Sequence, residues 1–111
     1  MAQTLTQVKN SASVVQLAVG RYLDTGTVAA IDFTTGFKPL WVRVANLNAS
    51  GDAMLEWYHG MAAASAILVG IDGARSLITT LGITQLSYGF TLGLQTDVNV
   101  TSEQCSWMAI G

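Results

Sequence analysis

The sequence predicts an all-β fold: a single jelly-roll-like β-sandwich of seven or eight strands. Short runs of apolar or alternating residues recur about every 8–12 residues, and Gly, Asn, Asp and Ser separate them. The length of 111 residues fits one domain, and half of the residues are apolar, which is enough for one core. We expect residues 13–111 to form the sandwich and the polar residues 1–12 to form an extended arm before it.

The clearest strand of the first half covers residues 40–47. Its residues Leu40, Val42 and Val44 alternate with a mixed set, so the strand has one apolar face and one mixed face. The Asn, Ser, Gly and Asp residues within 46–52 predict a loop, so this strand and the next form a β-hairpin. The segment RYLDTG at residues 21–26 is expected to be a turn-bearing connection. The strands expected in this half are residues 14–20, 28–33, 40–47 and 54–59.

In the second half, plain alternation at residues 88–95 and the closing run CSWMAI at 105–110 predict two further strands. Gly89 and Gly93 lie inside the first of these and indicate bulges or a close approach of another backbone. The alanine-rich residues 61–66 are compatible with a short helical turn, and Asp72-Gly73 predicts a turn. Weaker strand patterns cover residues 76–86 and 98–101.

Charge is scarce in this chain. There are 5 Lys or Arg and 7 Asp or Glu residues, the net charge is −2, and 11% of residues are charged, against about 25% in typical soluble domains. High hydrophobicity with low net charge excludes a disordered chain. Five dispersed cations exclude an electrostatic nucleic-acid binder, because such a protein must neutralise a row of phosphates. A surface with so few ions favours an obligate oligomer or docking on a larger assembly.

The sequence contains no motif for catalysis or for a cofactor. It has one His, His59, and one Cys, Cys105, and we expect both to be structural. No G-x-S-x-G, phosphate-binding glycine motif or cluster of metal ligands is present, so we expect no enzyme, no cofactor and no metal. The polar first dozen residues predict no signal peptide, and hence synthesis in the cytoplasm. The most apolar run, residues 61–71, is too short to span a membrane and is expected to be a core segment.

Two sets of residues are candidates for contacts with a partner. Trp41, Trp57 and Tyr58 fall within expected strands, where aromatic side chains either pack in the core or anchor an interface. The arm is either a disordered terminus or a strap that adds a strand to a neighbour's sheet. Its candidate contact residues are Gln3, Leu5 and Val8.

Three segments resemble virion proteins of tailed bacteriophages. They are TGFKPLWVRVAN at residues 35–46, the aromatic pair at 57–58 and SWMAIG at 106–111. The pattern is most similar to the capsid decoration (staple) proteins of epsilon 15-like short-tailed phages. The resemblance implies a small jelly-roll protein on the outer capsid surface, which binds across neighbouring major capsid subunits and reinforces the shell as a homodimer or homotrimer. It brings no catalytic residues with it.

We therefore expect a capsid decoration protein whose partners are the major capsid protein and its own copies, with no nucleic acid and no membrane. The alternative is a phage tail or fibre module that binds a host cell-surface glycan. That alternative predicts an exposed aromatic platform beside a carboxylate, formed by residues 57–59 with Glu56.

Overall fold

The computed structural model describes residues 15–23, 26–48 and 53–111, which form eight strands and no helix. The prediction of an all-β fold is thus confirmed for the described residues. Residues 1–12, including Gln3, Leu5 and Val8, lie outside them. The strands are β1 (Leu17–Leu23), β2 (Ile31–Thr34), β3 (Trp41–Asn46), β4 (Met54–Tyr58), β5 (Ser65–Val69), β6 (Arg75–Gln85), β7 (Gly89–Leu92) and β8 (Gln104–Ile110).

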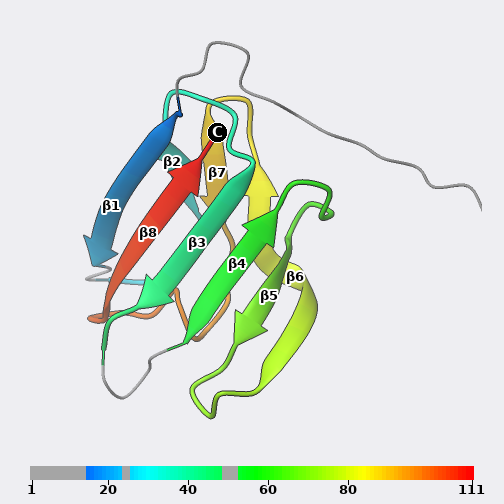
Figure 1. Cartoon of the computed structure of the whole chain (residues 1–111). Helices are drawn as coiled ribbons and strands as arrows, with labels where there is room; N and C mark the ends of the chain where they lie inside the picture. The colour runs from blue at the N-terminus through cyan, green and yellow to red at the C-terminus, as the bar shows by residue number, and fades with distance from the viewer. Residues whose placement is uncertain (1–14, 24–25, 49–52) are drawn as a thin grey trace, which may run out of the picture.

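All eight strands belong to one antiparallel sheet in the order β1-β8-β3-β4-β5-β6-β7-β2. The sheet is curled, so that β2 and β7 lie behind the layer that runs from β1 to β5 (Figure 1). The strand pairing is nested: β1 pairs with β8, and β2 pairs with β7. The expected hairpin of residues 40–59 is confirmed by the β3–β4 pairing.

The sheet bends from one layer to the other within β6. The first part of β6 pairs with β5 and its last part pairs with β7, and the register shifts between Ser65 and Ala66 on β5. Leu81 has a φ of 62°, in the left-handed region that non-glycine residues rarely adopt. Beside it, Gly82 lies so close to the Ser65 carbonyl that a Cβ there would be 2.6 Å from that oxygen. A glycine at this position lets the two backbones meet at the bend.

An aromatic cluster joins the two layers of the curled sheet. Phe33 of β2 stacks on Phe90 of β7 with ring centroids 4.8 Å apart, and it also lies 5.4 Å from Tyr22 of β1. Trp107 of β8 contacts both phenylalanines, at 5.2 and 5.5 Å. The Tyr22 hydroxyl donates to the Val98 carbonyl at 2.5 Å. The edge strands β1 and β2 share no backbone ladder and are therefore held together by ring packing, and the hydrogen bond of Tyr22 ties β1 to the connection before β8.

Three local predictions are wrong. Residues 21–23 continue β1 instead of turning, because all of β1 pairs with β8 and Tyr22 must point into the aromatic cluster. Residues 61–66 form no helical turn, since Ser65 already starts a strand that pairs with β6. Residues 98–101 form no strand, because the backbone turns there while the side chains of Val98 and Asn99 are buried.

Candidate interaction surface

The layer formed by β1, β8, β3, β4, β5 and the start of β6 turns one side-chain face inward and one outward. Val42, Val44 and Leu55 are fully buried, so the residues that alternate with them point away from the core. We call this the outer face. The strand registers arrange its residues in three rows: Leu17, Ile110, Trp41 and Tyr58; Val19, Met108, Arg43, Glu56, Ile67 and Leu77; and Arg21, Ser106, Ala45, Met54, Val69 and Arg75.

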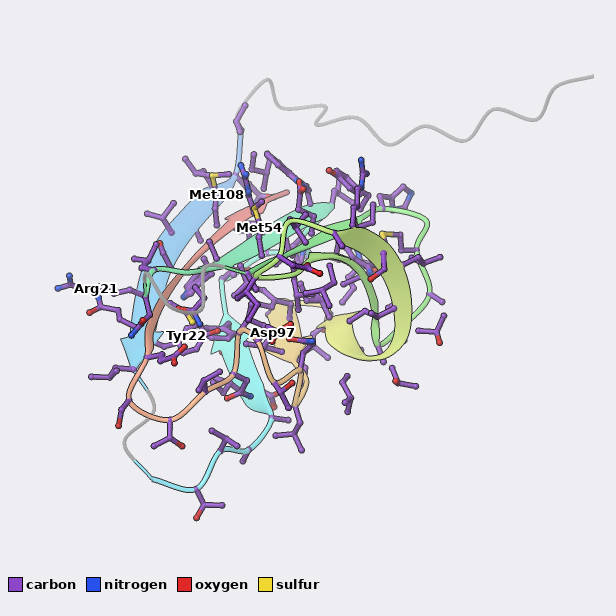
Figure 2. The ribbon with its side chains drawn as sticks, turned by 90° about the horizontal axis from the view of Figure 1, so that it is seen from below. Arg21, Tyr22, Met54, Asp97 and Met108 are labelled. Carbon is purple, nitrogen blue, oxygen red and sulfur yellow. The ribbon has the colours of Figure 1, made fainter. Side chains whose placement is uncertain are left out.

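Most of the outer face is apolar. Leu17, Val19 and Leu77 are 57%, 68% and 66% exposed, and the methionines of β4 and β8 are half-buried. Figure 2 places Met54 and Met108 on the side of the layer away from β2 and β7. Solvated sheet faces normally carry polar side chains, and a continuous exposed apolar face is typical of a binding surface.

The charges of the outer face are mainly positive. Three arginines, Arg21, Arg43 and Arg75, share it with one carboxylate, Glu56. Arg43 lies directly opposite Glu56 in the register, yet its Nε contacts Met54 Sδ at 2.8 Å and it makes no ion pair with a described residue. The guanidinium groups on this face are thus available to acceptors from outside.

One end of the outer face carries an aromatic pair. Trp41 and Tyr58 are cross-strand partners, and their rings stack with an interplanar angle of 8° and centroids 6.4 Å apart. The Tyr58 hydroxyl donates to Glu56 Oε2 at 2.7 Å, and this hydrogen bond raises the pKa of Tyr58 above its ordinary value. The indole Nε1 of Trp41 is shielded from solvent and has no acceptor among the described residues. These groups together form a flat ring surface flanked by a carboxylate.

A hollow of about 350 Å³ lies on the same face between β1 and the end of β3. Val19, Ala45, Leu47 and Met108 supply apolar walls, and Arg43 supplies a cation. Such a hollow has the chemistry to receive an apolar side chain beside an acceptor group.

The sequence-predicted contact residues separate in the structure. Trp41 and Tyr58 lie together on the outer face, whereas Trp57 is 2% exposed and its Nε1 donates to the Ala62 carbonyl. Gln3, Leu5 and Val8 lie outside the described residues. Sequence reasoning missed the other apolar residues of the outer face. The alternation in LAVGRYL and QCSWMAI would have marked their outward positions, had the pairing of the two strands been known.

The two residues considered for chemistry, His59 and Cys105, are not among the rows of the outer face. His59 is exposed at the end of β4, and its backbone N–H donates to the Leu40 carbonyl at 2.8 Å. Cys105 is buried in β8, where its Sγ lies 3.1 Å from the Val98 carbonyl. The described part of the chain contains no group of three metal-ligating side chains. It also contains no helix with the length and apolarity needed to cross a bilayer.

Comparison with known proteins returned no matching family model, no matching curated protein and no matching solved structure.

Proposed function

We propose that this chain is a capsid decoration protein of a tailed bacteriophage, which binds the outside of the head across neighbouring major capsid subunits and stabilises the shell. The observation that carries the proposal is the exposed apolar outer face, with arginines that lack ion pairs among the described residues. An exposed apolar face of this kind suits a structural protein that functions by binding other proteins. Repetition of one weak contact over a shell adds up to firm retention through multivalency.

The placement of the three segments that resemble phage virion proteins supports this proposal. Residues 35–46 lead into and form β3, residues 57–58 end β4, and residues 106–111 lie in and after β8. The sheet order puts these strands side by side as β8-β3-β4 (Figure 1). The resemblance is therefore concentrated in the centre of the proposed binding layer.

We further propose that the curled sheet is a variant of the jelly-roll sandwich. The nested pairs β1–β8 and β2–β7, and the neighbour relation of β8 and β3, are those of a jelly roll. Strands β3 to β6 instead follow one another as a meander. In this proposal the protein is made in the host cytoplasm and resides on the outer capsid surface.

Co-sedimentation with emptied capsids that lack this protein tests the function. We expect saturable binding at a fixed ratio to the major capsid protein. The variant Met108→Glu, which places a charge in the hollow of the outer face, should weaken binding about tenfold or more. Thr34→Glu is the matched control, because Thr34 is exposed on β2 and lies off the outer face. No binding of the wild-type chain to either immature or expanded capsids would refute the decoration role.

The stacked pair of Trp41 and Tyr58 beside Glu56 favours a second candidate, a tail or fibre module that binds a host glycan. Aromatic faces pack against sugar rings, and a carboxylate accepts hydrogen bonds from hydroxyl groups. This candidate predicts binding on a cell-surface glycan array that Tyr58→Ala abolishes. A blank array with the wild-type chain excludes it and leaves the capsid proposal untouched.

A further inference from the structure

Strand β1 has a partner strand on one side only within the described part of the chain. All seven of its residues pair with β8, and no described strand lies on the other side. In Figure 1, β1 forms the outer border of the front layer. The opposite end of the sheet, β2, is only four residues long and carries Asp32 among them. Natural sheets keep edges short or charged to prevent pairing with another chain, and β1 is longer and largely apolar.

The ladder with β8 fixes which backbone groups of β1 are open. The Gly111 N–H donates to the Gln16 carbonyl at 2.9 Å, whereas the Gln104 carbonyl, opposite Leu23, accepts from Leu47 beyond β3. Residues of an antiparallel strand alternate in the direction of their hydrogen-bonding groups. The even-numbered residues of β1 therefore bond β8. The residues that turn N–H and C=O toward the open edge are Leu17, Val19, Arg21 and Leu23.

We propose that a second copy of this chain occupies this edge, with the two β1 strands antiparallel and in a register centred on Gly20. In this register Leu17 faces Leu23 of the second copy, and Val19 faces Arg21. Every open backbone group of β1 then finds a partner in both copies. No arginine faces its own symmetry mate, which a register centred on Arg21 would require.

Gly20 suits the centre of such a pairing. The two central residues form a pair without direct hydrogen bonds, in which the Cα atoms approach most closely, to about 4.5 Å. Because glycine has no side chain, two Gly20 residues can approach this closely without a steric clash. Pairing of this kind also joins the outer faces of both copies into one continuous surface. The inference concerns the free protein and does not depend on the proposed function.

The test is sedimentation equilibrium of the full chain and two variants at Val19, with unfolding curves to verify that each is folded. We expect a dimer for the wild type. Val19→Lys sets a cation opposite Arg21 twice per dimer and should raise the dissociation constant about tenfold. Val19→Glu sets an anion opposite Arg21 and should leave that constant within about threefold. Val19 is 68% exposed, so neither change disturbs the core.

Leu77→Lys and Leu77→Glu are the controls, because Leu77 is equally exposed on the outer face but lies on β6. Both should leave the dimer unchanged. A monomeric or trimeric wild-type chain overturns the proposal, and so does dissociation by the Leu77 variants. Equal weakening of the dimer by Val19→Lys and Val19→Glu also overturns the proposal. It would indicate a register centred on Val19, in which residue 19 of each copy faces residue 19 of the other, so that like charges meet in either variant. No capsid is present in this assay, so its outcome is separate from that of capsid binding.

Discussion

At the scale of single residues, Gly20 leaves the space that the Trp107 indole occupies between β1 and β8. A Cβ at Gly20 would lie 2.8 Å from atoms of the Trp107 indole, which is itself part of the aromatic cluster. Gly20→Ala should therefore lower the free energy of unfolding by about 1–3 kcal/mol, because the ring must leave its place. Gly26→Ala is the control, since no atom lies within 4 Å of its Cβ position. Urea unfolding curves measure both, and equal stability of the two variants would refute this contact.

The hydrogen bond from Tyr58 to Glu56 gives a pH-dependent prediction. The pKa of Tyr58 is raised, so the stabilisation that this bond contributes is present at neutral pH. It is lost as the pH rises through the raised pKa of the folded state. Glu56→Gln should lower the pKa of Tyr58 toward its ordinary value, because the charged acceptor is gone.

NMR titration of labelled tyrosine measures that pKa. Glu103→Gln is the comparison, because Glu103 binds Asn46 elsewhere in the molecule and should leave the Tyr58 titration unchanged. An identical Tyr58 pKa in the wild type and in Glu56→Gln would contradict the assigned cause.

Residue-level prediction from the sequence succeeded where alternation was regular and failed where burial depends on the strand partner. Trp57 and Tyr58 are adjacent in the chain and the sequence makes both candidates for a contact, but neighbouring strand residues point to opposite faces. Tyr58 meets Trp41 across the β3–β4 ladder, whereas Trp57 enters the core. The glycine signals were informative, since a Cβ at Gly89 would overlap the Phe33 carbonyl and one at Gly93 would lie 2.7 Å from Leu81.

At the scale of elements, the bend of β6 is the point where the sheet passes from one layer to the next. Gly82→Ala should cost about 1–3 kcal/mol, because the added methyl group meets the backbone of Ser65 and Ala64. Leu81→Asn should change stability by less than about 1 kcal/mol. Asn tolerates the left-handed conformation better, and the Leu81 side chain is half exposed. Thermal unfolding compares the two variants, and a harmless Gly82→Ala would contradict the close approach described for this bend.

The strands could be predicted more easily than the connections. The strands at 40–47 and 54–59 carry both alternation and a loop signal between them, and the structure has them as β3 and β4. Residues 98–101 look like a strand because they are apolar at alternate positions. The structure instead uses Val98 to accept the Tyr22 hydroxyl and Asn99 to donate to the Ala29 and Gly93 carbonyls. Tyr22 and Ala29 are 76 and 70 residues away from their partners, beyond the reach of a local pattern.

At the scale of the whole molecule, the low charge of the sequence has a structural counterpart in the apolar outer face. The low charge of the sequence indicates that part of the surface binds another molecule, but it does not indicate which part of the surface does so. That information lies in the strand order. In the sheet, β8 lies between β1 and β3, although it is far from both in the sequence. Only this order assembles Val19, Met108 and Arg43 into one row. The proposed role, binding an outer capsid surface through this face, depends on that assembly.

The most direct test of this account is hydroxyl-radical footprinting of the chain bound to emptied capsids and of the free chain. Methionine and aromatic side chains oxidise readily, and Met54, Met108 and Tyr58 lie on the outer face. Tyr88 is 69% exposed in the connection between β6 and β7, away from that face, and serves as the internal reference. We predict lower oxidation of Met54, Met108 and Tyr58 on the capsid, with Tyr88 unchanged. Protection of Tyr88 with unaltered oxidation of Met108 would contradict the account.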